Sequence, residues 1–200
     1  HGASIPPAFM VTTLAFDHFL EENGIDGEYR RLTSGLEAIL ANAAIPEKEK
    51  RAKIEEASTC IRDLIRRASL DPARGLGRLI MAAVDSCGLR DSFVSVRSSG
   101  LQEDTEEAAF AGAAETYLFV SMAELLERIK EVWTSFWLTR GILYQSDRVV
   151  RQGSARLAIG VPSLLAAAMA ARTAARLSAV RPVTPRASSW AWVGAVLVPS

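Results

Sequence analysis

The stretch Val96–Val120, VRSSGLQEDTEEAAFAGAAETYLFV, carries most of the information about the fold of this 200-residue chain. Its start belongs to a predicted strand, DSFVSVRSS, in which Val94 and Val96 face one way and Ser95 and Arg97 face the other. A run of acids and then a run of small residues, AAFAGAA, follow the strand. This middle part matches neither a core segment nor a simple turn, and its residue types are compatible with a binding loop.

Downstream of the loop the sequence predicts a strand over Glu115–Val120 and then a helix. Ser121 and Glu124 form a capping box at the helix start. The helix carries apolar residues at helical spacing, and we interpret its tryptophans as core aromatics: Met122, Leu125, Leu126, Ile129, Val132, Trp133, Phe136 and Trp137. A further alternating strand covers Leu157–Val161.

Upstream, helical patterns dominate. A strand is predicted around Phe9–Thr12, followed by a helix that presents Phe16, Phe19 and Leu20 on one face and stops at Gly24. Three more helices are predicted, the first over Glu28–Ala41, the second from Pro46 to about Ala68, and the third from a cap at Asp71 to about Cys87. Helices come first and a small, mainly antiparallel sheet follows, so we assign the α+β class.

The amino-acid composition argues against a nucleic-acid-binding, membrane-spanning or disulfide-rich secreted protein. Basic and acidic residues balance, 23 against 23, so nothing draws the chain towards nucleic acid or an acidic membrane surface. No apolar run reaches the roughly 18 residues of a membrane span. Two cysteines give no disulfide framework, which favours a reduced, cytoplasmic setting. Because the first residue is His1 and no signal-peptide pattern follows, we expect a piece of a longer protein.

The middle segment has the chemistry of a phosphate clamp. Arg97 at a strand end offers a rigidly held guanidinium, which donates paired, charge-assisted hydrogen bonds to phosphate oxygens. The small-residue loop around Gly112 lets backbone N–H groups approach a phosphate closely. Thr116 adds a hydroxyl donor at the start of the next strand.

The residue pattern also allows a plainer interpretation, in which Arg97 forms a surface ion pair. An arginine beside acids is more often a surface ion pair worth about 0–1 kcal/mol. In that case Arg97 would pair with Glu103 or Asp104 and face solvent, and the segment would be scaffolding of a non-catalytic remnant or interaction module. The chain has no Walker or GxGxxG motif, no hydrolase triad and no metal-ligand set, and His18 is expected on a helix surface.

The motif VRSS…ED…AFAG…ETYL closely resembles the N-terminal ATP-binding domain of phosphoenolpyruvate synthase and its relatives. These relatives include pyruvate phosphate dikinase and rifampicin phosphotransferase. That family reads roughly VRSSA-x-x-ED-x-x-x-x-SFAGQ-x-[DE]TYL. The segments IPPAFMVTTLAFDHFL and EVWTSFWLTRGILYQ are similar to its other motifs, so the likeness spans about residues 5 to 161. Small departures are Ala8, Gly100, Ala109 and Ala113.

The resemblance implies the first lobe of an ATP-grasp nucleotide-binding domain over residues 1–161. In that family Arg97 would bind and stabilise the phosphates of ATP, Gly112 would lend lid backbone and Thr116 would contact the nucleotide. The parent enzymes pass phosphate from ATP to a histidine on a separate domain, and from there to pyruvate or, in the rifampicin type, to a drug hydroxyl. Magnesium is expected, with ligands outside this fragment, and the fragment alone is expected to be inactive.

The match fails after Val161. Relatives continue with a V-Q-x-M-V stretch whose glutamine touches ATP, whereas Pro162 and Ser163 follow here and the segment 162–200 is rich in alanine and arginine. We favour translation out of frame for this aberrant tail, which would remove the second lobe with its magnesium-binding acids. The alternatives are an alanine-rich helix over Leu164–Val180 with a disordered end, or a membrane-surface helix.

Overall fold

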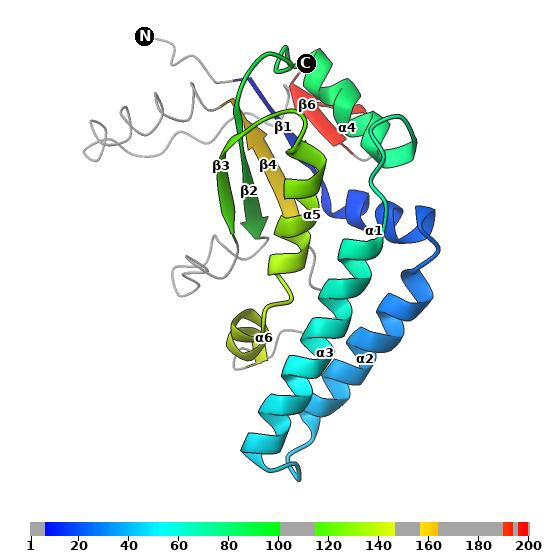
Figure 1. Ribbon diagram of the computed structural model, residues 1–200, viewed down its shortest axis with the longest axis vertical. Coiled ribbons are helices and arrows are strands. Elements are labelled where there is room, and N and C mark those ends of the chain that lie inside the picture. The colour runs from blue at the N-terminus through cyan, green and yellow to red at the C-terminus, as the bar shows by residue number, and fades with distance from the viewer. Residues whose placement is uncertain (1–6, 101–114, 147–156, 164–189, 194–195, 200) are drawn as a thin grey trace, which may run out of the picture.

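The computed structural model describes residues 7–100, 115–146, 157–163, 190–193 and 196–199. This part of the chain forms six strands and six helices (Figure 1). The strands are β1 (Ala8–Val11), β2 (Val94–Gly100), β3 (Thr116–Val120), β4 (Leu157–Pro162), β5 (Trp190–Val193) and β6 (Val196–Pro199). The helices are α1 (Thr13–Glu22), α2 (Asp26–Ala41), α3 (Glu47–Arg67), α4 (Gly75–Ser86), α5 (Leu125–Ser135) and α6 (Thr139–Ser146).

The strands form one sheet in the order β3-β2-β4-β1-β6-β5, and every pairing in it is antiparallel. Strands β1 and β4, which are far apart in sequence, lie side by side at its centre, with Phe9 opposite Val161 and Val11 opposite Ile159. All four of these side chains are buried. The predicted α+β class, with helices on a small antiparallel sheet, is confirmed.

Strands β5 and β6 extend this sheet beyond β1. Met10 lies opposite Leu197, and Val11 lies opposite Val196, while β5 pairs with the outer side of β6. Both strands come from the segment 162–200 that we predicted as an aberrant tail. The predicted helix over 164–180 lies outside the described residues, so the division of the chain after Val161 stays a prediction.

Helix α1 follows the predicted pattern. Phe16, Phe19 and Leu20 are buried on one face, and the helix ends before Gly24, whose φ of 65° suits a residue without a side chain. The amide of Asn23 closes the end: it donates to Phe19 O (2.9 Å) and accepts from the backbone N–H of Ser69 (2.8 Å). The α1 terminus is thereby joined to the loop that follows α3.

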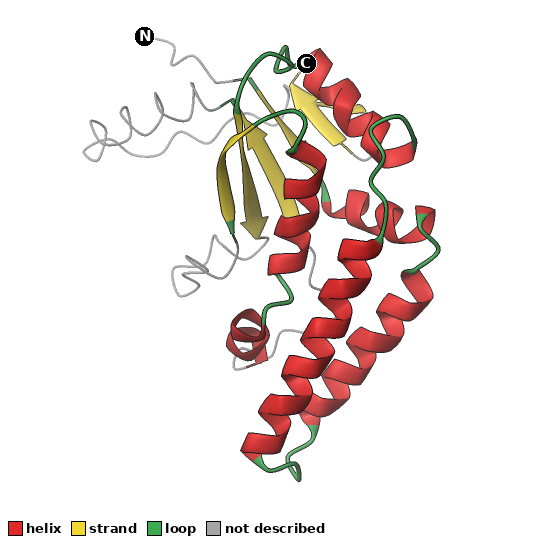
Figure 2. Ribbon diagram, in the orientation of Figure 1, coloured by secondary structure: helices red, strands yellow, loops and turns green. Residues whose placement is uncertain are grey.

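Helices α2 and α3 form an antiparallel pair that projects away from the sheet (Figure 2). The predicted apolar stripe of α3 is buried at Ile54, Ile61 and Ile65, which explains the packing. The predicted pair of Glu49 and Lys53 is present, with 3.0 Å between the carboxylate and the ammonium. The basic side chains of α3 are interleaved with acids on its exposed side, as expected of a solvated helix face.

The start of α4 differs from the prediction. Asp71 does not cap the helix; its carboxylate accepts from the N–H of Ala73 (2.8 Å) in a turn, and the helix begins only at Gly75. The first turn is capped from elsewhere, because Glu22 of α1 accepts from the N–H of Leu76 (3.0 Å). A partner more than 50 residues away gives no local sequence signal.

Helix α5 connects the sheet to the helical pair. Trp133 and Trp137 are buried, and the Trp133 ring lies 5.2 Å and 5.1 Å from the rings of Phe16 and Phe19, so the predicted core role is confirmed. The Lys130 ammonium donates to the carbonyls of Arg66 (3.1 Å) and Ala68 (3.2 Å), and so caps the end of α3.

The predicted capping box before α5 is half formed. The Glu124 carboxylate accepts from the hydroxyl of Ser121 (2.6 Å) and from its N–H (3.4 Å). The helix starts only at Leu125, with Glu124 rather than Ser121 as its N-cap, so it begins three residues later than the box predicts. The hydrogen bond from the Ser121 hydroxyl lowers the pKa of Glu124. Within the described residues, none of the helices combines the length and the apolar character needed to cross a bilayer.

Candidate functional site

The two faces of the sheet differ in character. Val94 and Val96 of β2 and Ile159 of β4 belong to the same buried core as the side chains of α5, so the helices pack on this face. Arg97 alternates with these residues and is exposed on the opposite face. We call that opposite side the open face.

A row of residues crosses the open face at the level of Arg97. Thr116 of β3 lies directly opposite Arg97 on one side, and Gly160 of β4 lies directly opposite it on the other. Met10 of β1 is in turn opposite Gly160. Directly opposed residues in an antiparallel pair present their side chains to the same face, with Cβ atoms about 4.5–5.5 Å apart. Guanidinium, hydroxyl and thioether therefore share one surface, with a glycine between Arg97 and Met10.

The Arg97 guanidinium forms no salt bridge with the described residues. In the described part of the chain, no carboxylate lies within ion-pair distance of it. Several other arginines there are paired, such as Arg66 with Glu131 (3.4 Å) and Arg90 with Asp85 (2.5 Å), although Arg51 and Arg78, like Arg97, form no ion pair among the described residues. The two acids named by the plainer interpretation, Glu103 and Asp104, lie outside the described residues, so that pairing stays an expectation.

Next to this row the pairing of β2 with β3 is irregular. Val94 pairs with Val120, but Val96 pairs with Tyr117, so one residue of β2 faces two residues of β3. Leu118 and Phe119 are both exposed as a result, and Phe119 has a φ of 55°. Ser95, the residue opposite this bulge, is fully buried, and its hydroxyl has no hydrogen-bond partner.

The β3 end of the row is fixed by Tyr117, which faces the helices. Its hydroxyl donates to the Glu115 carboxylate, and the guanidinium of Arg128 from α5 lies 5.1 Å from its ring centre. Burial, together with the hydrogen bond to Glu115, raises the pKa of Tyr117, so the phenol stays protonated as a donor. This anchor holds Thr116, its neighbour, in register with Arg97.

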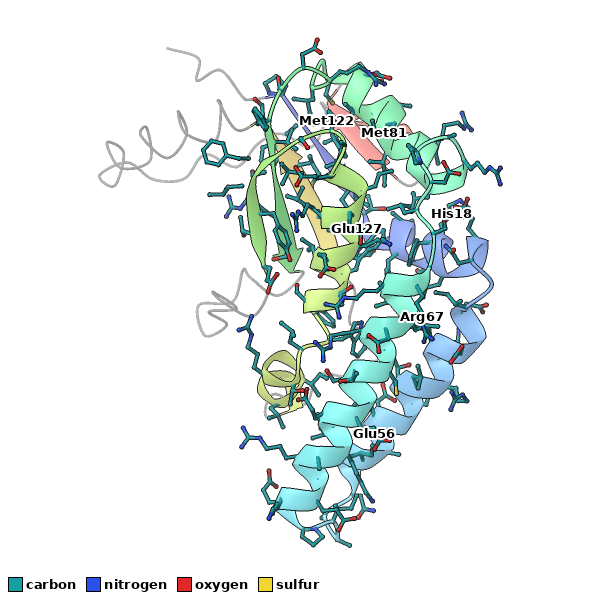
Figure 3. All side chains as sticks on the ribbon, viewed as in Figure 1. His18, Glu56, Arg67, Met81, Met122 and Glu127 are labelled. Atoms are coloured by element: carbon teal, nitrogen blue, oxygen red, sulfur yellow. The ribbon has the colours of Figure 1, made fainter. Side chains whose placement is uncertain are left out.

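Other groups that could take part in catalysis or bind a metal were sought among the described residues. His18 is exposed on α1, as predicted, on the opposite flank of the molecule from β2 and β3 (Figure 3). Among the residues that the structure describes, no group of three or more histidine, cysteine, aspartate or glutamate side chains could hold a metal ion. The described residues therefore do not fit a magnesium site.

The predicted phosphate-binding role of Arg97, Gly112 and Thr116 stays a prediction. Arg97 and Thr116 are neighbours on one exposed surface, whereas Gly112 lies outside the described residues. Gly160 and Met10 were missed as members of the row. Strand register brings them beside Arg97, and no local motif in either strand signals that register.

Comparison with known proteins shows where this chain belongs. The family model described as "Pyruvate phosphate dikinase, AMP/ATP-binding domain" matches residues 1–179. A phosphoenolpyruvate synthase of Aeropyrum pernix is 32% identical over 187 residues, which cover 92% of this chain and 21% of that protein. A probable phosphoenolpyruvate synthase of Methanocaldococcus jannaschii is 32% identical over 148 residues, 74% of this chain and 12% of that protein.

A rifampicin phosphotransferase of Bacillus cereus is 29% identical over 147 residues, which cover 72% of this chain and 15% of that protein. The chain thus spans about a fifth or less of the length of these relatives. The family match covers most of the chain and includes the strands that carry Arg97, Thr116 and Gly160. This chain therefore belongs to the pyruvate phosphate dikinase AMP/ATP-binding domain family.

Proposed function

We propose that the open face around Arg97 binds the phosphates of ATP. The observation that carries the proposal is the position of Arg97: it is exposed in a row with the Thr116 hydroxyl, without a carboxylate partner among the described residues. A guanidinium that is not neutralised by an acid keeps its full charge for a phosphate, and its fork donates two parallel hydrogen bonds. Membership of a family described as AMP/ATP-binding supports the choice of ligand.

The roles within the site follow from donor chemistry. Arg97, held by the ladders of β2 on both sides, would stabilise negative charge on the phosphoryl oxygens, and Thr116 would donate one further hydrogen bond. Gly112 would contribute backbone N–H groups from the segment between β2 and β3. The domain would be the first lobe of an ATP-grasp fold, with the second lobe supplied by further chain.

The parent reaction would be phosphoryl transfer from ATP to an enzyme histidine and then to pyruvate or a similar acceptor, in the cytoplasm. Magnesium, when bound, neutralises charge on the phosphates in such transfers. The described residues offer no ligand set for it, so we derive no step through the metal. We expect this chain alone to bind nucleotide without completing the transfer, because it covers only about 21% of a full-length phosphoenolpyruvate synthase.

The test is a calorimetric titration of this chain with ATP and with inorganic tripolyphosphate. We expect Arg97→Ala to weaken both ligands by about tenfold or more, since a charge-assisted hydrogen bond contributes about 1.5–3 kcal/mol. Arg51→Ala is the matched control, because Arg51 is exposed on α3 and outside the sheet. Equal binding by the two variants, or no binding by the unmodified chain, would remove the proposal.

The likeness to rifampicin phosphotransferase favours a second candidate for the parent enzyme, transfer of phosphate to a drug hydroxyl. Both candidates use ATP, so the first titration does not separate them. Incubating a longer protein that contains this chain with ATP and either pyruvate or rifampicin would do so, with the phosphorylated product identified by mass spectrometry. A non-catalytic binding module would phosphorylate neither acceptor.

A further inference from the structure

We infer that Gly160 forms the seat on which a phosphate of the nucleotide rests beside Arg97. This inference rests on the proposed function and deepens it, because it assigns a role to a residue of β4 outside the clamp motif. The starting observation is that a glycine occupies the middle of the sheet, in a strand paired on both sides. Glycine in a strand interior weakens the strand and often marks a close approach by a ligand or another backbone.

The packing of the fold does not explain this glycine. A Cβ built on Gly160 meets no atom of the described residues within 4 Å, and the backbone φ is not positive. The contrast with Gly77 is clear, since a Cβ there would lie 2.1 Å from the carbonyl oxygen of Asp71. The fold thus requires a glycine at Gly77 and would accept a side chain at Gly160.

The neighbours of Gly160 indicate what could occupy the space above it. Arg97 lies opposite on β2 and Met10 lies opposite on β1, so the position between the guanidinium and the thioether carries no side chain. We call this position the notch. Adjacent strands are about 4.7–4.9 Å apart, which places the notch within the reach of a guanidinium. An anion held by Arg97 could therefore settle against the backbone of β4.

The role of Gly160 in this site is steric. Its peptide groups lie within the ladders to β2 and β1, so they are not free to donate to a ligand. The absent methyl group allows a phosphate oxygen to approach the sheet while the guanidinium, supported by its own backbone, binds from the side. A larger residue would lift the phosphate out of line with Arg97 and Thr116.

The experiment measures tripolyphosphate and ATP binding by Gly160→Ala and Gly160→Val, with thermal unfolding as the control on the fold. We expect binding to weaken with side-chain size, to about tenfold for valine, which corresponds to about 1.4 kcal/mol. Thermal stability should be unchanged or higher, because valine favours strands. Gly35→Ala is the matched control, since its Cβ also meets open space but lies on α2.

The possible outcomes are distinct. If Gly160→Val still shows unchanged, Arg97-dependent binding, Gly160 has no role in phosphate binding, and the proposed function is unaffected. Binding that does not depend on Arg97 removes both. Weaker binding by Gly160→Val with an unchanged melting temperature supports the seat, whereas a parallel loss in Gly35→Ala would show a general effect of removing glycine and contradict it.

Discussion

At the scale of single residues, Phe119 has the most unusual backbone. It is the one non-glycine residue with positive φ in the described chain, at 55°. A residue with a Cβ carries about 1–2 kcal/mol of steric cost in this region. Phe119 gains little from burial in return, because its side chain is 69% exposed. The bulge that keeps β2 and β3 paired therefore holds a locally strained residue beside the proposed site.

Replacing this residue should stabilise the fold. We expect Phe119→Asn to raise the free energy of unfolding by about 1 kcal/mol, since asparagine tolerates left-handed backbone. Thermal unfolding would show a melting temperature higher by about 2–4 °C for a chain of this size. Leu118→Asn is the matched control, because Leu118 is also exposed (58%) but has no positive φ. A similar gain in both variants would show that the effect comes from replacing an exposed apolar side chain, and would contradict the account of backbone strain at Phe119.

The sequence predicts the exposed strand positions of Arg97 and Thr116 from local patterns, whereas their role in a site stays a prediction. Arg97 follows from its residue type and its position at a strand end, and Thr116 follows from the start of the next strand. Gly160 could not be found in this way, because its meaning depends on a pairing between β2 and β4 that spans some 60 residues. In the sequence, a glycine in a short alternating strand carries no signal that distinguishes a ligand-binding position from any other strand position.

At the scale of elements, α4 shows how a helix terminus is set by distant parts of the chain. The helix begins at Gly75, with φ of 42°, and Glu22 caps its first turn. The second glycine, Gly77, packs directly on the backbone of Asp71 in the preceding turn. The sequence predicts the end of the helix near Cys87, which depends on local residues, and it misplaces the start, which depends on distant ones.

A pair of glycine substitutions tests this account of α4. Gly77→Ala should destabilise the fold by about 1–3 kcal/mol, because its Cβ would lie 2.1 Å from a backbone oxygen that cannot rotate away. Gly35→Ala, in the interior of α2 with open space around its Cβ, should instead stabilise the fold by up to about 1 kcal/mol. Chemical denaturation of the two variants gives both values. A stabilising Gly77→Ala would show that α4 does not pack on the Asp71 turn.

At the scale of the whole molecule, hydrophobic periodicity predicts most elements and does not predict how they are assembled. Strands β1 to β4 and helices α1 to α5 are predicted from local patterns, whereas α6 is not predicted as a separate helix. The order of the strands arises from pairings between distant segments, and a strand contributed by the last ten residues has no local sign that it belongs beside β1. The hairpin β5–β6 is the clearest example.

The hairpin β5–β6 can be tested directly, because its pairing with β1 should contribute to the stability of the sheet. Leu197 of β6 is paired with Met10 on one side and Trp192 on the other, so Leu197→Pro removes an N–H from the middle of a paired strand. Leu197→Val keeps the N–H and is the matched control. We expect Leu197→Pro to lower the free energy of unfolding by about 1–3 kcal/mol, because backbone pairing is lost, and therefore to lower the melting temperature.

The reactivity of Cys87 gives a local measure of whether β6 is lost from the sheet. Its thiol is half-buried at the end of α4 and lies 3.5 Å from the carbonyl of Ala8 in β1, and burial raises its pKa, so alkylation should be slow. Cys60, exposed on α3, serves as the internal reference for reagent activity. Since β6 contacts both α4 and β1, its loss should accelerate alkylation of Cys87 and leave Cys60 unchanged. Unchanged melting and unchanged Cys87 reactivity in Leu197→Pro would show that β1 is the true edge of the sheet, and that residues 190–199 are the unrelated tail expected from the sequence.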